Sequence, residues 1–478
     1  MIAQRLSARR LQELLGAWRG DGHSYRELSE SIGILVRDGR LPPASVLPAE
    51  RPLAEQLGVS RTTVAAAYQR LREDRVVESR RGSGTVVLGP RATGGDRRPL
   101  GADEEISLTR ASPGPWSGLP ELGRRALAEH ADAFLLDGFD TIGHPALREI
   151  IAQRYTDRGL PTRPDQIMVT LGAQHAIFLI ARTLLRRGDR SLIESPSYPH
   201  AREALAAAGA LVAELPVGVR GHDAASMLEI TRRSAARLAY LIPDHHNPTG
   251  LSMPPELREH LIANLADQGA HLVVDETTAE LVLGAPRPVL PFAASAARPH
   301  HHDAILTVGS LGKTVWGGLR VGWIRAAPDL IARLEAARVV GDLGTGTWAQ
   351  VLGALALERY DEVLADRARE LTAGHRALLA ALERRLPEWS FSPATGGVSV
   401  WADLGEPRST RLGREAARLG LRIPPGPQFG SPGVFERFVR LPFAAAGVDL
   451  TRAVEVLSRA WRGGRGSATP APVRAELV

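Results

Sequence analysis

A single lysine, Lys313, stands in a chain whose other basic residues are all arginine. It lies in the stretch Ser310-Leu311-Gly312-Lys313-Thr314 and is one of 59 basic residues in the sequence. A desolvated lysine can lose its proton and attack an aldehyde, whereas arginine keeps its charge and offers no nucleophilic amine. An arginine-rich composition could also leave one lysine by chance. Ser310 and Arg320 flank the lysine and suit a phosphate beside an imine, so we predict pyridoxal 5′-phosphate on Lys313 as an internal aldimine.

Four further residues could contact the ring of this cofactor or its substrate. Asp275 ends an apolar run and could keep the pyridine nitrogen protonated, although such an aspartate is often only a helix cap. Asn247, in an Asn-Pro-Thr-Gly turn that is ordinary by itself, could donate to the phenolate oxygen. Tyr198 could stack on the ring or pack in the core. Arg440, in an apolar strand, could bind a substrate carboxylate or lie on an edge strand at the surface.

The phosphate group requires donors at the opposite end of the cofactor. Gly172, Ala173 and Gln174 begin a predicted helix directly after a predicted strand, and the N-terminal end of a helix receives phosphate through its N–H groups and dipole. Ser310 and Arg320 complete the predicted phosphate site. No metal-binding residues are predicted.

A second group of polar residues, near the N-terminus, could read DNA. Ser60 caps a predicted helix from Arg61 to Leu71, which presents Arg61 and Thr62 on the face opposite its apolar residues. A short polar face at a helix N-terminus suits base edges in a major groove. A predicted helix over 47–57 precedes it, and a hairpin with Arg81 near its tip follows, as a wing for phosphate or the minor groove.

The excess positive charge gathers in the same region. Residues 1–100 hold 17 arginines and 11 acidic residues, a balance of +6. The net charge of the whole chain is also +6, so the remaining residues are neutral overall. This predicts a polyanion partner for the N-terminal part, although a solvated basic face would give the same count. The absence of cysteine excludes disulfides, thiolate catalysis and zinc fingers. No apolar run approaches membrane-spanning length and no signal peptide begins the chain, so we expect a cytoplasmic location.

The chain divides into five predicted segments. These are a helical extension over 1–20, a DNA-binding domain over 21–88, a flexible linker over 89–107, a large domain over 108–462 and a disordered tail over 463–478. In the large domain, strand-like runs alternate with helices, which predicts a mostly parallel sheet covered by helices on both faces. A smaller subdomain is expected from about residue 349. In such sheets ligands bind beyond the carboxyl ends of the strands.

The stretch LPAERPLAEQLGVSRTTVAAAYQRL, with RRGSGTVV after it, resembles the winged helix-turn-helix (α+β) of the GntR family. The resemblance implies that DNA is contacted by a set of residues in the helices and the wing: Arg51, Ser60, Arg61, Thr62, Arg81 and Gly82. Arg75 departs from the pattern, which usually has glycine before the wing. A backbone with positive φ at that place would be strained by arginine. A small helical domain for protein contacts is the alternative.

The large domain resembles the α/β fold type I aminotransferases, which depend on pyridoxal phosphate. The order and spacing of the chemistry-bearing residues match, including 38 residues from Asp275 to Lys313. The resemblance implies that Asp275 pairs with the pyridinium, Lys313 forms the Schiff base and Arg440 binds the substrate carboxylate. Thr278 stands where the family commonly has tyrosine, and Gly312 replaces a frequent phosphate-binding serine. These losses would weaken the hold on the cofactor and disfavour efficient transamination.

Together the two domains resemble the MocR subfamily of GntR transcriptional regulators. The resemblance implies a homodimer that binds an operator of two half-sites and responds to pyridoxal phosphate, an amino acid or an amine, in vitamin B6 or amino-acid metabolism. Whether the dimer exchanges domains, which operator it binds and whether it activates or represses stay open. A catalytically active aminotransferase with an autoregulatory DNA-binding domain is the alternative. A scaffold that dimerises without a cofactor is a third.

Overall fold

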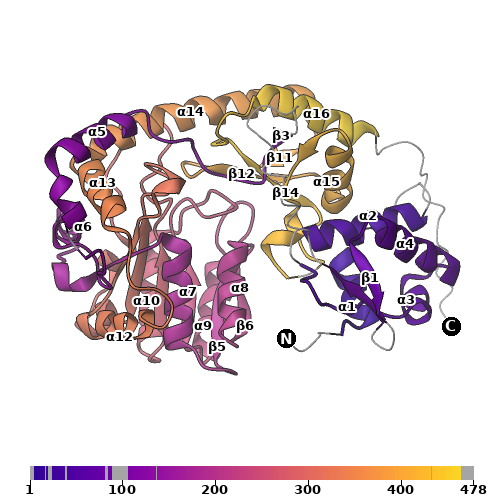
Figure 1. The fold of residues 1–478 in the computed structure, drawn as a ribbon, viewed down its shortest axis with the longest axis horizontal. Helices are drawn as coiled ribbons and strands as arrows, with labels where there is room; N and C mark the ends of the chain where they lie inside the picture. The colour runs from indigo at the N-terminus through magenta and orange to yellow at the C-terminus, as the bar shows by residue number, and fades with distance from the viewer. Residues whose placement is uncertain are drawn as a thin grey trace.

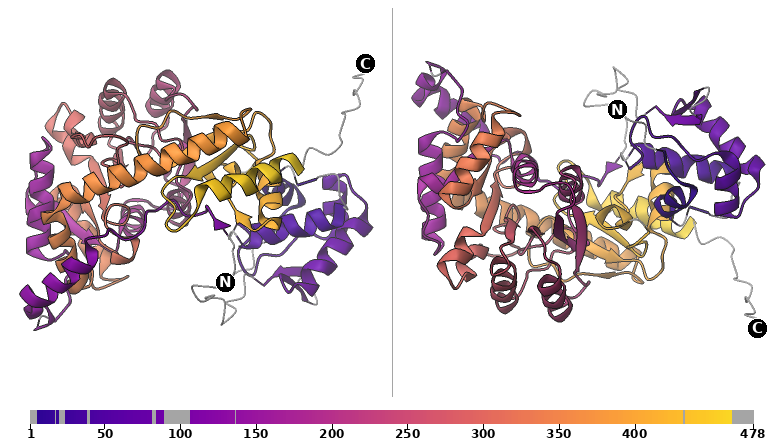
Figure 2. Two further views of the ribbon diagram at one scale, coloured as in Figure 1. Left: turned by 90° about the horizontal axis from the view of Figure 1, so that it is seen from above. Right: turned by 90° about the horizontal axis from the view of Figure 1, so that it is seen from below.

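The computed structural model describes residues 5–16, 18–19, 24–37, 40–80, 84–88, 106–135, 137–431 and 433–463. They form an elongated molecule with an N-terminal domain at one end, a small subdomain in the middle and a large subdomain at the other end (Figures 1 and 2). The predicted wing residues Arg81 and Gly82, the linker up to 105 and the tail from 464 lie outside the described residues. Within the described part, no helix is both long and apolar enough to cross a membrane.

The N-terminal domain is a bundle of four helices with a two-stranded hairpin. Its elements are α1 (Ala8–Leu15), α2 (Ser24–Arg37), α3 (Glu50–Leu57), α4 (Arg61–Glu73), β1 (Val77–Arg80) and β2 (Gly84–Val87). The helix predicted from Leu47 begins only at Glu50, because Pro52 is tolerated in a first turn alone. Arg75, just before the hairpin, has φ of 55°, so the residue carries the strain that its side chain predicts.

The large subdomain is built on a seven-stranded sheet in the order β4-β10-β9-β8-β7-β5-β6. The strands are β4 (Ile167–Thr170), β5 (Arg190–Ser195), β6 (Leu211–Pro216), β7 (Leu238–Leu241), β8 (His271–Asp275), β9 (Ile305–Ser310) and β10 (Gly322–Arg325). The predicted mostly parallel sheet is confirmed, and β10 alone runs antiparallel to both neighbours. Consequently β4, β5, β7, β8 and β9 all end at one edge of the sheet.

Helices cover both faces of this sheet (Figure 1). They are α5 (Leu119–Glu129), α6 (Pro145–Asp157), α7 (Ala173–Leu184), α8 (Pro199–Ala207), α9 (Ala224–Arg233), α10 (Pro255–Ala266), α11 (Pro299–Asp303), α12 (Pro328–Arg338) and α13 (Thr347–Glu358), with short 3-10 helices η1 (Ala131–Leu135), η2 (Pro164–Gln166), η3 (Phe292–Ser295) and η4 (Gly317–Leu319). Alternate strand residues enter different cores. Leu272 and Val274 pack with α6, α10 and α13, whereas Val273 packs with α7 and α12.

The small subdomain follows along α14 (Tyr360–Arg385), a helix of 26 residues that joins the two cores (Figure 1). It contains β11 (Ser390–Phe391), β12 (Ser399–Asp403), α15 (Ser409–Arg418), β13 (Leu421–Arg422), η5 (Gly426–Phe429), β14 (Phe438–Pro442) and α16 (Leu450–Gly463). The predicted start near 349 is too early, because α13 packs in the core of the large subdomain. Within α14, the residues of the second core begin at Leu371.

Two residues assigned to the linker and one assigned to the tail belong to the folded part. Ile106 and Ser107 form β3, which pairs in parallel with β13. Gly463 is the last residue of α16. A two-residue strand leaves no periodic pattern, so the sequence offered no signal for β3. Its pairing carries the segment from 108 to 112 across the small subdomain and toward the carboxyl edge of the large sheet.

Candidate functional site: a lysine cavity beside the DNA-binding domain

The predicted cofactor residues meet in a cavity of about 230 Å³ at the carboxyl edge of the sheet. We call it the lysine cavity. Its lining includes eight predicted residues, namely Ala173, Gln174, Tyr198, Asn247, Asp275, Ser310, Lys313 and Arg320. Strands β4, β5, β7, β8 and β9 each end at one of these residues or shortly before one. Parallel pairing therefore collects side chains that are far apart in the sequence.

Asp275 is fixed by two hydrogen bonds at the end of β8. The hydroxyl of Tyr240 on β7 donates to its Oδ2 at 2.6 Å, and the N–H of Thr277 donates to its Oδ1 at 3.0 Å. Burial strongly raises the pKa of Tyr240, and the Asp275 carboxylate raises it further, so the phenol stays a donor. Because both oxygens accept a hydrogen bond, the orientation of this buried carboxylate at the cavity is fixed.

The environment of Lys313 favours a neutral amine. Burial lowers the pKa of this lysine, the carboxylate of Asp275 opposes the shift, and the guanidinium of Arg440 adds to it. A lowered pKa increases the fraction of unprotonated amine near neutral pH, which is the nucleophilic form. The lysine also faces both the lysine cavity and a second, larger cavity.

The predicted phosphate site is a tight junction between two chain segments. Arg320 donates from Nη2 to the carbonyl oxygen of Leu171 at 2.5 Å and from Nη1 to that of Gly317 at 3.4 Å. Gly172, which precedes α7, has φ of 91°, and a Cβ on it would lie 3.1 Å from Nη2 of Arg320. Both observations require glycine there. The guanidinium therefore lies across the N-terminal end of α7, where anions bind.

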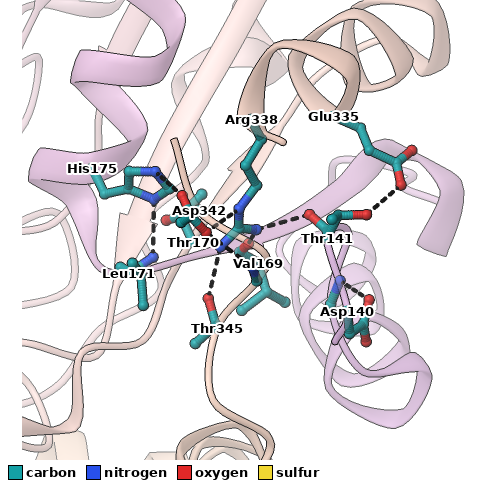
Figure 3. Close-up of polar contacts among 12 residues, drawn as sticks. Asp140, Thr141, Val169, Thr170, Leu171, His175, Glu335, Arg338, Asp342 and Thr345 are labelled. Carbon is teal, nitrogen blue, oxygen red and sulfur yellow. Dashed lines mark hydrogen bonds and ion pairs between the residues drawn. The ribbon is translucent and has the colours of Figure 1, made fainter. Parts of the chain in front are cut away.

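A partly buried network of hydrogen bonds supports this junction on the side of Arg338 (Figure 3). The N–H of Leu171 donates to Nδ1 of His175 at 3.2 Å, and Nε2 of His175 lies 2.9 Å from Oδ2 of Asp342. Arg338 binds Oδ1 of Asp342 at 2.7 Å and donates to the carbonyl oxygen of Val169 at 2.7 Å. With Nδ1 accepting, the ring must carry its proton on Nε2, and burial lowers its pKa, which favours that neutral form.

The departures from the aminotransferase pattern have visible consequences. The Thr278 hydroxyl donates to the carbonyl oxygen of Asp244 at 3.1 Å, so it does not replace a tyrosine donor in the cavity. The Ser310 hydroxyl donates to the carbonyl oxygen of Val321 at 3.2 Å and accepts from the N–H of Gly312 at 3.0 Å. A Cβ on Gly312 would lie 3.2 Å from Oγ of Ser310. A serine at position 312 would therefore crowd the side chain of Ser310.

Arg440 reaches the cavity region from β14 of the small subdomain. Its Nη2 donates to the carbonyl oxygen of Thr109 at 2.6 Å, and its Nη1 lies 3.4 Å from Oδ1 of Asn247. The guanidinium lies over the ring of Phe429, 5.0 Å from the centroid. Burial lowers the pKa of Arg440 to about 10, and no carboxylate pairs with the side chain among the described residues. A buried guanidinium without a carboxylate partner could still receive the carboxylate of a ligand, as the sequence predicts for Arg440.

A second cavity of about 750 Å³ adjoins the first and reaches the N-terminal domain. We call it the interdomain cavity. Lys313, Tyr198, Asn247 and Ser112 line both cavities, whereas Ile34 and Arg40 line only the interdomain one, along with residues of α15. Five arginines line it, from both domains: Arg40, Arg110, Arg414, Arg422 and Arg440.

The two domains also touch directly beside this cavity. Arg414 on α15 is buried, and its Nη1 donates to the carbonyl oxygen of Trp18 at 2.7 Å and to Oγ of Ser31 at 3.2 Å. Arg418 pairs with Glu30 on α2. Burial lowers the pKa of Arg414. Because a buried arginine must keep its partners, this contact ties the position of the N-terminal domain to α15.

The predicted DNA-binding residues that the structure describes lie at the start of α3 and α4. Arg51 and Arg61 are exposed and pair with Glu55 at 3.1 Å and Glu50 at 3.2 Å, respectively. Thr62 is exposed as well. The Ser60 hydroxyl accepts from the N–H of Thr63 at 3.1 Å, so its role in the structure is to cap α4.

Two parts of the site were missed by the sequence reasoning. Tyr240 lies in a buried strand, and its partner Asp275 belongs to a different strand. A tyrosine in an otherwise apolar run was the available signal, since a buried hydroxyl needs a partner. Thr109 and Ser112 follow the linker, and only the pairing of β3 with β13 brings them to the cavities. No local pattern marks them.

Comparisons with known proteins identify the families of the two domains. The family model for class I and II aminotransferases matches residues 119–457, and that for bacterial regulatory proteins of the gntR family matches residues 24–87. The chain is 31% identical to the probable rhizopine catabolism regulatory protein MocR of Rhizobium meliloti, over 76% of this chain and 78% of that protein. It is 30% identical to the 2-aminoadipate transaminase of Thermus thermophilus, over 73% of this chain and 87% of that protein.

A solved structure gives the same fold. The crystal structure of LysN, the alpha-aminoadipate aminotransferase from Thermus thermophilus in complex with N-(5′-phosphopyridoxyl)-L-leucine, superposes with a TM-score of 0.68 at 29% identity. The match covers 75% of this chain and 92% of that chain.

Proposed function

The chain belongs to the class I and II aminotransferase family, in the MocR subfamily that joins such a domain to a GntR-type DNA-binding domain, and we propose that it is a transcriptional regulator whose DNA binding responds to a ligand at Lys313. The observation that carries this proposal is the interdomain cavity. The predicted cofactor lysine and residues of the DNA-binding domain line this same cavity. A ligand there would contact both domains and favour one arrangement of them over another.

The lysine cavity fits pyridoxal phosphate, the cofactor on which its family depends. Lys313 offers the amine, Asp275 a fixed carboxylate for the pyridine nitrogen, and Arg320 with the start of α7 a cationic site for the phosphate. When bound, the cofactor supplies an electron sink. Asp275 would keep its nitrogen protonated, and Tyr240 would hold Asp275 in place.

We infer that the effector is an amine that carries a carboxylate, such as an amino acid. Lys313 and Arg440 face the same interdomain cavity, so one molecule can meet the cofactor through its amine and the guanidinium through its carboxylate. Pyridoxal phosphate itself is the second effector that the cavity allows. An Arg440→Met variant separates the two, because it should abolish a response to amino acids while leaving a response to the cofactor alone.

The cofactor site is tested by incubating the full chain with pyridoxal phosphate, reducing it with borohydride and mapping the labelled peptide by mass spectrometry. Label on Lys313 is the expected result. An unlabelled chain that keeps its fold would refute the cofactor proposal and leave the scaffold alternative.

A catalytically active aminotransferase is a second proposal, favoured by Arg440 beside Lys313 and by the likeness to the Thermus transaminase. The hydroxyl of Thr278 is an argument against the enzyme. It already donates to the carbonyl oxygen of Asp244, so it does not supply the hydrogen bond that a tyrosine would donate in the cavity. Multiple-turnover formation of a keto acid from any amino acid would establish the enzyme. A single half-reaction without turnover would leave the regulator.

We further propose a cytoplasmic homodimer that binds two half-sites on DNA. The large subdomain exposes a group of apolar side chains around the bridge that joins Asp140 to Gly344. Its members are Leu135, Phe139, Val339, Val340 and Leu343, all at least half exposed. An exposed apolar patch of this kind marks a protein interface, and a second copy of the chain is the partner that the family resemblance implies.

A further inference from the structure

Three side chains with metal-ligating atoms meet at the edge of the sheet opposite the lysine cavity. Asp267 follows the last residue of α10, and His300 and His301 lie on α11, just before β9. Nε2 of His300 lies 2.9 Å and Nε2 of His301 lies 3.0 Å from the same Oδ1 of Asp267. All three ligand atoms lie within 4.8 Å of one another. No other such cluster occurs in the described part of the chain.

The spacing of these atoms suits a tetrahedral ion. Bonds of about 2.0–2.1 Å from Zn²⁺ to nitrogen and oxygen place neighbouring ligand atoms about 3.3 Å apart. An outward shift of a few tenths of an ångström would therefore admit the ion between Asp267 and the two rings. Two imidazoles and one carboxylate leave a fourth position for water.

Access to the cluster is open from one side. His301 is only 2% exposed, so its ring is held in place, whereas about half of the surface of His300 and Asp267 faces solvent. Arg298 lies 3.5 Å from Oδ2 of Asp267, whereas both histidines contact Oδ1. Its positive charge weakens cation binding, and its contact leaves Oδ1 directed at both rings.

We propose that Asp267, His300 and His301 bind a divalent transition-metal ion, with Zn²⁺ as the best-matched ion, and that the ion ties the end of α10 to α11. The site is separate from the lysine cavity. Asp267 precedes β8 and α11 precedes β9, whereas Asp275 and Ser310 end those strands. Five strand residues separate the two edges by about 16 Å. The bound ion would stabilise the loops at the amino edge of the sheet.

The alternative is a hydrogen-bonded tie in which both rings donate to Asp267 without any metal. An Asp267→Asn variant distinguishes the two, because the amide oxygen can still accept from the rings but no longer brings the negative charge. A His300→Ala variant removes one ligand at a half-exposed position. His260, an exposed histidine on α10 outside the cluster, supplies the matched control His260→Ala.

The test is calorimetric titration of the metal-free, untagged full chain with zinc chloride, with thermal unfolding measured alongside. One ion per chain is expected, and a higher unfolding temperature with zinc. Loss of an outer-shell partner alone costs about 10–100-fold in metal affinity, so loss of a ligand in Asp267→Asn or His300→Ala should cost at least tenfold. His260→Ala should bind as the wild type does. Absent binding in the wild type, or equal binding in Asp267→Asn, would overturn the proposal.

Discussion

At the scale of single residues, the site depends on side chains that hold other side chains. Asp275 is aimed by Tyr240, and the turn at Leu171 is held by His175. Neither tyrosine nor histidine was expected to matter from the sequence. The residues with chemistry of their own could be predicted because their types are unusual where they stand, as with the one lysine. Their supports could not, because hydrogen bonds between strands and helices follow from tertiary packing.

Removing the hydroxyl of Tyr240 should weaken cofactor binding without disturbing the fold. A buried hydrogen bond is worth about 1 kcal/mol, so Tyr240→Phe should lower the affinity for pyridoxal phosphate about fivefold. Absorbance titration of the full chain measures this. Tyr68→Phe is the control, because Tyr68 also donates from a buried hydroxyl, to the carbonyl oxygen of Pro48 at 2.8 Å, in the other domain. An equal loss in both variants would contradict the role of Tyr240.

The lowered pKa of His175 predicts a dependence of stability on pH. A histidine whose folded pKa lies below 6.5 contributes its full stability above that pH, and loses it as the pH falls, because the unfolded chain then binds a proton that the folded chain does not. His175→Asn keeps an acceptor near the position of Nδ1 and cannot titrate.

We therefore expect the unfolding temperature of His175→Asn to fall less than that of the wild type between about pH 7.5 and about pH 5.5. Other buried histidines titrate in both proteins, so the difference between the two isolates His175. An equal fall of the unfolding temperature in both proteins would show that His175 does not cause the loss of stability in this pH range.

At the scale of elements, strands and helices were predictable where their patterns are long, and short ones were not. The strand-like apolar runs that predicted a sheet include the largely buried strands β4, β8 and β9. The two residues of β3 gave no signal, and α13 was assigned to the wrong subdomain because a helix in an interior does not reveal which core it enters. Sequence sets the periodicity of an element, and tertiary packing sets its neighbours.

The residues at the start of α4 are predicted to contact the bases of DNA. Arg61→Ala should weaken binding to the upstream DNA of its own gene by about 1–3 kcal/mol, because a bidentate contact to a base is lost, while scrambled DNA is bound nearly as before. Fluorescence anisotropy on both DNAs measures the ratio. Arg9→Ala is a matched control, since Arg9 on α1 is equally exposed and also ion-paired. An unchanged ratio in Arg61→Ala would place the contact elsewhere.

At the scale of the whole molecule, the proposed regulator would couple a ligand-binding domain to a DNA-binding domain through the contacts between them. The interdomain cavity, the buried guanidinium of Arg414 and the ion pair of Arg418 with Glu30 are among the places where the two domains meet. The domain order could be predicted from motifs and charge. The shared cavity could not, because its lining comes from α2, the segment after the linker, α8, α15 and β14.

The apolar patch around Phe139 and Val340 should hold a dimer together. Val340→Asp places a charge where 78% of a valine is now exposed, so burial against a second copy would become unfavourable. We expect the full chain to shift from dimer to monomer in sedimentation experiments. Leu290→Asp, at an exposed leucine elsewhere on the large subdomain, is the control and should stay dimeric. A dimeric Val340→Asp protein would exclude this patch as the interface.

The most direct test of the account measures the affinity of the full chain for its upstream DNA while a ligand is titrated. Fluorescence anisotropy is followed with pyridoxal phosphate first, and then with amino acids added to the loaded protein. We predict a change in affinity in the wild type at one of these steps and none in Lys313→Ala. An affinity indifferent to every ligand, or one that changes equally in Lys313→Ala, would contradict a ligand-responsive regulator that works through this lysine.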